Sequence, residues 1–364
     1  QSDYCIADRF GPTTVFEDDD IVVYTDVEYG VANHFLTDQP VSLLADVYLP
    51  NPEIDPMATR PLVVLIHGGA WLAGNKSIMA YQCQEYAKRG YVAISVGYRL
   101  GWGCTGTDAL TACISCGGLG SNLRKAVYSG VQDSRAAMRY FFSTAEDYGI
   151  DTSMVFIGGE SAGSINSLLA YYLDQGEADA FIPGFSATAG SLDESGNDLD
   201  TPWSIKGIIN HCGGVTNTSI MDNNELVPII SFHDDADCIV PFNCGNTLSC
   251  FCSSFFGICG SNSIHTYYSL QGAPSILRPV LLSLNHCSYP AYQVVNHGSC
   301  FMKQTMCGVA VNYTDTNVYS VAVCDAMGFA CEEATSCPED LNGDWIVNTS
   351  DLLIFLSAFG SPCD

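Results

Sequence analysis

Basic side chains are scarce in this chain, which has 13 lysines and arginines against 40 aspartates and glutamates. The formal net charge is −27 at pH 7 over 364 residues. Nucleic acids, heparin-like polymers and anionic membranes are bound through basic surface, so the composition argues against all three as partners. The acidity suits an ordinary secreted protein or, more specifically, a saline habitat in which salt screens self-repulsion.

Long apolar runs are also missing. No stretch approaches the ~18 consecutive apolar residues that a membrane-spanning helix needs, so we expect no membrane insertion. The chain begins at Gln1 without a basic and apolar leader, as a mature secreted protein would after loss of its signal peptide, although trimming would look the same. Hydrophobic residues still make up 47 % of the chain, enough for a sizeable core.

Cysteine, by contrast, is abundant. Eighteen cysteines are far too many for an ordinary cytosolic enzyme of this size. Metal binding is the alternative, but Cys113 and Cys116 form the one CxxC-spaced pair and lack a second pair or a nearby histidine. We therefore predict about nine disulfides and a secreted or extracellular location, with the periplasm as the alternative.

From about residue 20 to 290, short apolar runs alternate with helical stretches. Strands are predicted at Pro61–Ile66, Tyr91–Val96, Met154–Ile157, Ile205–Asn210, Val227–Phe232 and Pro279–Leu284. Helices are predicted at Asn122–Tyr148, from Ala162 to Leu173, and at Tyr289–Met306. Apolar strands separated by helices indicate an α/β fold whose mostly parallel sheet is covered on both faces. Inserted loops at 100–121 and 175–203 are expected to shape a cleft above the strand ends.

The sequence Gly159-Glu160-Ser161-Ala162-Gly163 follows a predicted strand and opens a predicted helix. This is the context that a nucleophile turn of the type G-x-S-x-G requires. The glycines are needed because side chains would collide around a serine held in a strained turn. The start of the helix behind Ser161 favours developing negative charge. We predict Ser161 as a nucleophile.

A second motif, His67-Gly68-Gly69-Ala70-Trp71, follows the strand Pro61–Ile66. With it, residues 40–290 resemble the bacterial HGG-type carboxylesterases, which are related to the hormone-sensitive lipase group. The resemblance implies an α/β-hydrolase fold and an oxyanion hole formed by the backbone N–H groups of Gly69, Ala70 and Ala162. Alanine replaces the commoner third glycine, but the role needs only its N–H. We interpret His67 as bracing this loop.

The strand Val227–Phe232 runs into His233-Asp234-Asp235-Ala236-Asp237-Cys238-Ile239-Val240-Pro241. This resembles the family's pattern of a short turn, an alanine, the catalytic aspartate, a hydrophobic pair and a proline. The resemblance selects Asp237 as the acid. Asp234 and Asp235 remain alternatives, more naturally explained as turn formers.

Seven histidines compete for the role of base. His286 follows the last predicted strand, so the order serine, aspartate, histidine matches that of α/β-hydrolases. His297 is the alternative, inside a predicted helix, and the others come too early in the chain. In the mechanism that follows, His286 takes the Ser161 proton, Asp237 holds the imidazole, and an acyl-enzyme forms and is hydrolysed. No metal or organic cofactor is required for this catalysis.

Cys238 and Cys287 each directly follow a predicted triad residue. Because the imidazole must meet the carboxylate, the two cysteines are expected to lie within the ~7 Å between Cα atoms that a disulfide allows. We predict a Cys238–Cys287 bridge, which resembles the cysteine tied beside the catalytic histidine in some secreted polyester and feruloyl esterases. Cys212, after the strand Ile205–Asn210, is the strongest competitor for either cysteine.

The composition changes again near the C-terminus, so we predict a catalytic domain at 1–335 and a small module at 336–364. The module resembles one half of a dockerin-type repeat, although Trp345 stands where the calcium loop normally has glycine and a second loop is missing. The implied calcium ligands are Asp340, Asn342, Asp344, the Ile346 carbonyl, Asn348 and Asp351. Docking to a cohesin-type partner is a weaker expectation, and an acidic turn that caps a helix is the alternative.

The sequence thus predicts a secreted serine carboxylic-ester hydrolase (EC 3.1.1). Short acyl esters, or acyl groups of polysaccharides or polyesters, are the expected substrates. Two alternatives remain open. A peptidase of the same fold usually carries a large extra domain, and a non-catalytic adhesion or scaffold protein on an esterase fold has typically lost the serine or the histidine.

Overall fold

The computed structural model describes residues 4–6, 8–103, 119–249, 255–322, 324, 329–330 and 346–347. The chain divides into two compact units, Gln1–Ala322 and Val323–Asp364, earlier than the boundary expected at residue 335. In the second unit, β13 (Phe329–Ala330) pairs antiparallel with β14 (Ile346–Val347). The other five predicted calcium-binding residues lie outside the described part of the chain, so the calcium loop stays a prediction.

The first unit is built on a nine-stranded sheet in the order β1-β2-β4-β3-β5-β6-β8-β11-β12. The pairs β1–β2 and β2–β4 are antiparallel, and every later pair in this order is parallel. The strands are β1 (Ile21–Asn33), β2 (Pro40–Pro50), β3 (Arg60–Ile66), β4 (Val92–Val96), β5 (Ile150–Glu160), β6 (Gly207–His211), β8 (Ile229–Asp234), β11 (Ser275–Val280) and β12 (Asn312–Thr314).

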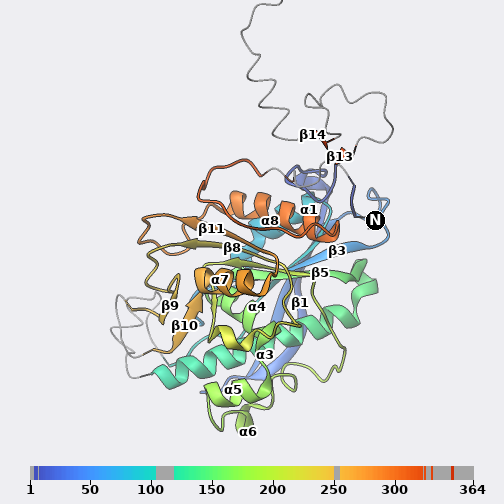
Figure 1. The fold of residues 1–364 in the computed structure, drawn as a ribbon. Helices are drawn as coiled ribbons and strands as arrows, with labels where there is room; N and C mark the ends of the chain where they lie inside the picture. Colours follow the sequence, from blue (N-terminus) through green and yellow to red (C-terminus); the bar gives the residue numbers. More distant parts are fainter. Residues whose placement is uncertain are drawn as a thin grey trace, which may run out of the picture. The chain divides into compact units, whose positions relative to one another are not determined.

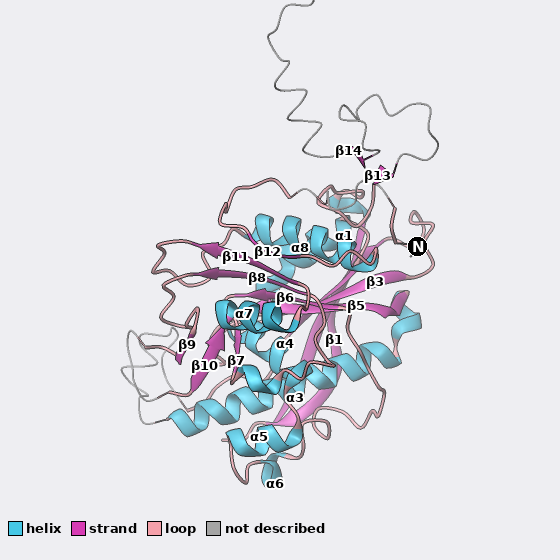
Figure 2. Cartoon of the chain, in the orientation of Figure 1, coloured by secondary structure: helices cyan, strands magenta, loops and turns pink. Residues whose placement is uncertain are grey.

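Helices cover both faces of this sheet, as predicted (Figures 1 and 2). Every residue of β3, β4, β6 and β8 is buried, which explains why these strands read as unbroken apolar runs. The helices α1 (Ala80–Lys88) and α8 (Ala291–Met306) contribute to one buried core. The helices α3 (Gly120–Ser143), α4 (Ala162–Tyr172) and α7 (Ser261–Gln271) contribute to the other.

Shorter elements fill the connections. A three-stranded sheet in the order β7-β10-β9 joins β7 (Gly214–Val215), β10 (Gly257–Gly260) and β9 (Cys244–Asn246). The 175–203 insertion holds α5 (Gln175–Phe181) and α6 (Ser186–Ala189). Single 3-10 turns lie at Asp18–Asp20, Lys76–Met79, Ala145–Tyr148 and Thr218–Ile220. None of the described helices is long and apolar enough to cross a bilayer.

The last long strand differs from its prediction. It was expected at Pro279–Leu284, but β11 spans Ser275–Val280 and leaves Leu281–Leu284 in a loop. The prediction was wrong because a run of apolar residues such as these leucines is also typical of a buried strand. The polar position Ser275 is in fact buried, while Leu282 is exposed.

Three disulfides join described cysteines: Cys5–Cys307, Cys212–Cys287 and Cys244–Cys259. Cys238, Cys300 and Cys324 are also disulfide-bonded. Cys83 is a buried free thiol inside the α1 core, so the full complement of nine bridges cannot form from 18 cysteines.

Candidate active site

Ser161 lies in a sharp turn between β5 and α4. Its φ of 53° and ψ of −119° are a strained backbone conformation for a residue with a side chain. The flanking glycines are required by space: a Cβ on Gly159 would lie 2.4 Å from the Ile66 carbonyl oxygen, and one on Gly163 would lie 2.0 Å from the same atom. The turn therefore packs against the end of β3, which is the reason that side chains cannot replace these two glycines.

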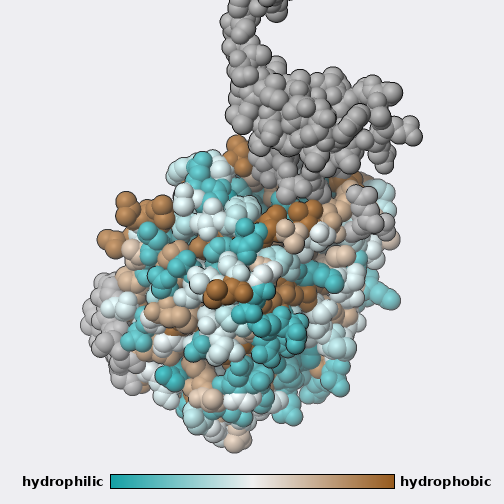
Figure 3. Space-filling view, in the orientation of Figure 1, coloured by the Kyte–Doolittle hydropathy of each residue, from teal (hydrophilic) through white to brown (hydrophobic). Residues whose placement is uncertain are grey.

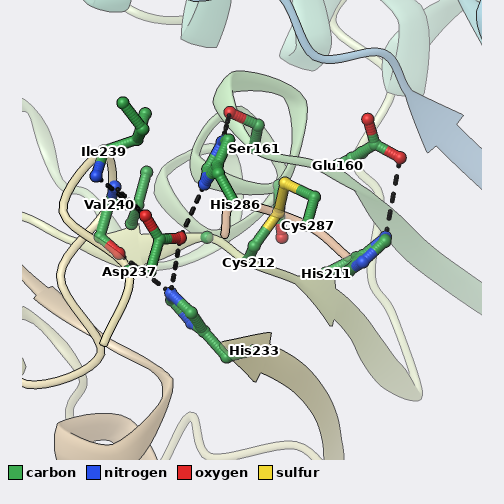
Figure 4. The surroundings of a disulfide bond; sticks show 12 residues. Glu160, Ser161, His211, Cys212, His233, Asp237, Ile239, Val240, His286 and Cys287 are labelled. Carbon is green, nitrogen blue, oxygen red and sulfur yellow. Dashed lines mark hydrogen bonds and ion pairs between the residues drawn. A yellow bond between two sulfur atoms is a disulfide. The ribbon is translucent and has the colours of Figure 1, made fainter. Parts of the chain in front are cut away.

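The structure brings Ser161, His286 and Asp237 together in one chain of hydrogen bonds (Figure 4). The Ser161 Oγ lies 2.7 Å from Nε2 of His286, and Nδ1 of His286 lies 2.6 Å from Oδ2 of Asp237. Each residue follows the carboxyl end of a parallel strand, namely β5, β11 and β8, and these ends meet at one edge of the sheet. In this geometry the imidazole can accept the serine proton at Nε2 while its Nδ1–H donates to the carboxylate.

Asp237 is surrounded by donors. Its Oδ1 accepts hydrogen bonds from the backbone N–H groups of Ile239 at 2.8 Å and Val240 at 3.2 Å. Burial by itself would raise the pKa of this carboxyl group, but hydrogen bonds from His233 and His286 outweigh burial and lower it to about 2. The carboxylate is thus ionised at any pH at which a histidine base would work.

His233 was assigned no role from the sequence, yet it is part of this arrangement. Its Nε2 lies 3.3 Å from Oδ2 of Asp237 and 2.9 Å from the Val240 carbonyl oxygen, while Nδ1 lies 2.7 Å from Oγ of Ser261. A carbonyl cannot donate, so Nε2 of His233 carries a proton that points at the Val240 carbonyl and the Asp237 carboxylate. The one available signal was its position at the end of a buried strand, four residues before the predicted acid.

The two alternative acids hold the surrounding loops instead. Buried Asp234 accepts hydrogen bonds from the backbone N–H and the hydroxyl of Ser288, two residues beyond the base. Asp235 accepts the backbone N–H of Ser283 at 3.0 Å. Both carboxylates therefore tie the acid turn to the histidine loop.

The alternative base lies elsewhere. His297 is in α8, with Nε2 at 3.2 Å from the Ser320 carbonyl oxygen. Burial, with the Arg278 charge nearby, lowers its pKa to about 4. His297 is thus a neutral histidine of the core on the α1–α8 face of the sheet.

The predicted Cys238–Cys287 bridge is wrong, because Cys287 pairs with its competitor Cys212 at 5.3 Å between Cα atoms (Figure 4). The backbone explains the choice. Cys212 directly follows β6, and its N–H bonds to the Phe232 carbonyl in the neighbouring strand β8. Cys238 instead accepts the Ser249 N–H at 2.8 Å, which turns it toward the segment before β10.

This disulfide lies next to two of the three residues in the catalytic chain, His286 and Ser161. Cys287 follows His286, and His211, which precedes Cys212, accepts the backbone N–H of Ser161 at 2.9 Å. His211 is buried, which lowers its pKa to about 3, and its Nδ1 lies 3.6 Å from the Glu160 carboxylate. Burial raises the pKa of Glu160. The bridge therefore joins the histidine loop to the strand that supports the serine turn.

The predicted oxyanion loop packs directly on the serine turn. A Cβ on Gly68 would lie 3.3 Å from the Cβ of Ser161, and Gly69, Ala70 and Trp71 all have positive φ. The Trp102 indole N–H donates to the Ala70 carbonyl oxygen at 3.1 Å. That bond orients the adjoining peptide group and holds the loop in place.

His67 braces this loop, as interpreted from the sequence. Its buried ring stacks on Tyr98 at 4.5 Å between ring centroids, and its Nδ1 lies 2.7 Å from the Gly68 carbonyl oxygen. Burial lowers its pKa, so it is neutral. The Tyr98 hydroxyl donates to the His67 carbonyl oxygen at 3.0 Å.

An apolar cavity, partly open to solvent, lies beside Ser161. Ala70 and Ala162, two of the three predicted oxyanion donors, line it with Ser161. The rest of its lining is almost entirely apolar: Trp71, Trp102, Leu123, Ile165, Ile239, Val240, Thr247, Leu248 and Phe256. Such a cavity suits an uncharged acyl or alkyl group next to a reacting carbonyl.

Comparison with known proteins adds the family context. A family model described as BD-FAE matches residues 45–114, well under half of the chain. Lipase 2 of Geotrichum candidum is 31% identical over 126 residues, which cover 32% of this chain and 20% of that protein. The probable carboxylic ester hydrolase LipM of Mycobacterium tuberculosis is 27% identical over 160 residues, covering 43% and 29%. The matches thus span less than a third of these relatives' lengths.

Among solved structures, esterase 2 of Thermogutta terrifontis, phosphorylated by paraoxon, superposes with a TM-score of 0.53. It is 18% identical, and the alignment covers 81% of this chain and 96% of that one. The likeness is in keeping with the strand order of the first unit described above. The chain therefore has the α/β-hydrolase fold.

Proposed function

We propose that this chain is a serine carboxylic-ester hydrolase in which Ser161 is the nucleophile, His286 the general base and Asp237 the residue that holds the imidazole. The observation that carries the proposal is the unbroken hydrogen-bonded chain from Ser161 Oγ to Asp237, set in a strained turn at the mouth of an apolar cavity. The matches to lipases and an ester hydrolase point to the same chemistry.

Catalysis would proceed in two steps. His286 removes the Ser161 proton as Oγ attacks the ester carbonyl, and the resulting imidazolium is stabilised by ionised Asp237. The negative charge on the carbonyl oxygen is stabilised by the N–H groups of Gly69, Ala70 and Ala162. His286 then protonates the departing alcohol, and a water activated by the same imidazole releases the acid.

The substrate class follows from the cavity. None of the described residues that line it is ionisable, so acyl groups without charge are favoured, and we propose short ones. Polysaccharide acyl groups or polyesters remain the proposed natural sources of such esters. Secretion is also part of the proposal, and it is supported by three disulfides among the described cysteines.

A panel of p-nitrophenyl esters from acetate to octanoate, run beside acetylated and feruloylated polysaccharides, tests the proposal. We expect hydrolysis to be fastest for the short esters and to be absent in Ser161→Ala. Paraoxon should inactivate the wild-type enzyme, and peptide mapping should find the phosphoryl group on Ser161. Hydrolysis that persists in the Ser161→Ala variant would refute the assigned nucleophile.

Calcium binding by the C-terminal unit is a separate proposal that rests on the spacing of Asp340, Asn342, Asp344, Asn348 and Asp351. Calorimetry of the full chain with calcium chloride, compared with an Asp340→Ala/Asp344→Ala variant, tests it. We expect binding by the wild-type chain and none by the variant. Equal heats would remove calcium from the account, and with it the expectation of a cohesin-type partner.

A further inference from the structure

Three leucines in the loop between β11 and His286 are turned toward solvent. Leu281 is 54% exposed, Leu282 95% and Leu284 81%, whereas Ser283 between them is 9% exposed. A surface loop normally shows the opposite pattern, with its polar residues outward. Figure 3 shows strongly hydrophobic atoms standing out from the surface on the side where β8 and β11 end in Figure 1.

The backbone holds the leucine loop (Leu281, Leu282 and Leu284) in this orientation. The N–H of Asp235 donates to the Val280 carbonyl at 3.0 Å, and the N–H of Ala236 donates to the Ser283 carbonyl at 3.1 Å. The Asp235 carboxylate accepts the Ser283 N–H at 3.0 Å. Leu282 is left-handed with a φ of 57°, a conformation that costs a leucine energy. The exposure is therefore fixed by the fold and is not a loosely packed end.

The leucine loop lies beside the candidate active site. It leads directly into His286, and the acid turn to which it is bonded continues into Ile239 and Val240, which line the apolar cavity. Its apolar surface and the cavity thus flank the same two loops at the carboxyl ends of the strands. Contiguous exposed apolar residues of this kind mark contact surfaces.

Charge restricts what such a surface can contact. From residue 207 to 302 the sequence contains one lysine or arginine, Arg278, which is 1% exposed. With no exposed cation on this part of the chain, and a net charge of −27, an anionic membrane would be repelled. An uncharged apolar material would bury the leucines without an opposing charge.

We propose that the leucine loop is a docking surface for a condensed phase of uncharged aliphatic ester, which it places against the mouth of the cavity. The proposal rests on the proposed ester hydrolase function and extends it from dissolved esters to water-insoluble ones. Inserting leucine side chains into such a phase removes them from water, which is favourable by the ordinary hydrophobic effect.

Tributyrin droplets are a suitable probe, because the same ester can be offered dissolved below its solubility limit. The test variant is Leu282→Asn/Leu284→Ser, since asparagine tolerates the left-handed conformation that Leu282 adopts. Leu270→Ser is the matched control: Leu270 is 78% exposed, but it lies near the end of α7, just before β11 begins, and hence at the opposite edge of the sheet.

We expect the test variant to lose about tenfold or more of its adsorption to droplets and of its rate on them. Its kcat/KM on dissolved tributyrin should stay within about twofold of the wild type, and the control variant should match the wild type in every assay. Adsorption is also measured with Ser161→Ala, by depletion from the aqueous phase. This binding readout remains valid even if the chain hydrolyses no ester at all.

Three outcomes would overturn the proposal. Unchanged adsorption and droplet rate in the test variant would mean that the leucines contact no ester phase. An equal loss on dissolved and condensed tributyrin would place them in the reaction itself. A wild-type dimer that becomes monomeric in the variant, with adsorption unchanged, would assign the surface to a second copy of the chain.

Discussion

Removal of the Cys212–Cys287 bridge should lower both stability and activity, whereas removal of Cys5–Cys307 should lower stability alone. The first bridge closes a loop with a sequence separation of 75 residues and the second one of 302. With the chain-entropy relation, these lengths give about 4.5 and about 5.7 kcal/mol of stabilisation. Both values are upper estimates because the remaining disulfides already restrict the unfolded chain.

The activities should separate the two variants. Cys287 is covalently next to His286, and Cys212 follows the residue whose carbonyl accepts the Ser161 N–H. Without the bridge the imidazole loses its tie to the serine turn, and a displacement of about 1 Å can cost about 100-fold in rate. We expect kcat of Cys212→Ala/Cys287→Ala to fall by about 10- to 100-fold. The Cys5→Ala/Cys307→Ala variant should keep its kcat.

The assay combines urea unfolding, which gives the free energy of unfolding, with p-nitrophenyl acetate kinetics at 25 °C, scaled to the folded fraction that the unfolding curve gives for each variant. Alanine is preferred over glycine because both cysteines at the active site have positive φ, and glycine would also change the backbone strain. Equal kcat values for the two variants would refute the reasoning, since the bridge beside His286 would then act only through global stability.

Three further predictions concern single side chains. Ser161→Ala should abolish turnover. Its melting temperature should stay within a few degrees of the wild type, because only a hydroxyl is removed. A large drop in melting temperature would make the loss of activity uninformative. His233→Ala removes one donor to Asp237, so the pKa of that carboxyl group should rise from about 2 toward its usual value. We expect the free energy of unfolding to fall by about 2 kcal/mol and kcat/KM to fall most steeply on the acid side of the pH profile. A pH profile equal to that of the wild type would contradict this prediction. Burial lowers the pKa of His211 to about 3 and that of His297 to about 4, so between pH 6 and about 4 the unfolded chain binds a proton at each ring that the folded chain does not. As the pH is lowered through that window, the free energy of unfolding should fall by about 1.4 kcal/mol per histidine per pH unit. A urea midpoint that stays flat from pH 7 to 4.5 would contradict this prediction.

Local sequence was sufficient for the turn around Ser161 and for the strands that lead into it. The glycines at 159 and 163 are readable because any side chain there would overlap the end of β3, whatever the rest of the fold. Fully buried parallel strands leave unbroken apolar runs, so β3 and β4 were located to within one residue. The motif placed Ser161, the resemblance to the family's pattern selected Asp237, and the chain order favoured His286; the structure joins these three residues by hydrogen bonds.

Other features depended on which strands lie side by side. Cys287 pairs with Cys212 rather than Cys238 because β6 lies next to both β5 and β8, and the acid turn directs Cys238 away toward Ser249. His233 became part of the site only when its strand positioned it against the turn that bears Asp237. Nearness in sequence to a triad residue does not fix direction in space, and direction is what decides a disulfide or a hydrogen bond.

The leucine loop is a second case in which the sequence did not determine the direction of side chains. Hydrophobicity alone indicated that Leu281, Leu282 and Leu284 continue a buried strand. The tertiary structure ends that strand at Val280 because Asp235 and Ala236 bond to the loop backbone from the neighbouring turn and hold the leucines outward. Sequence determined that these residues are apolar; only the packing of the two loops decided that they face water, beside the residues proposed to cleave an ester.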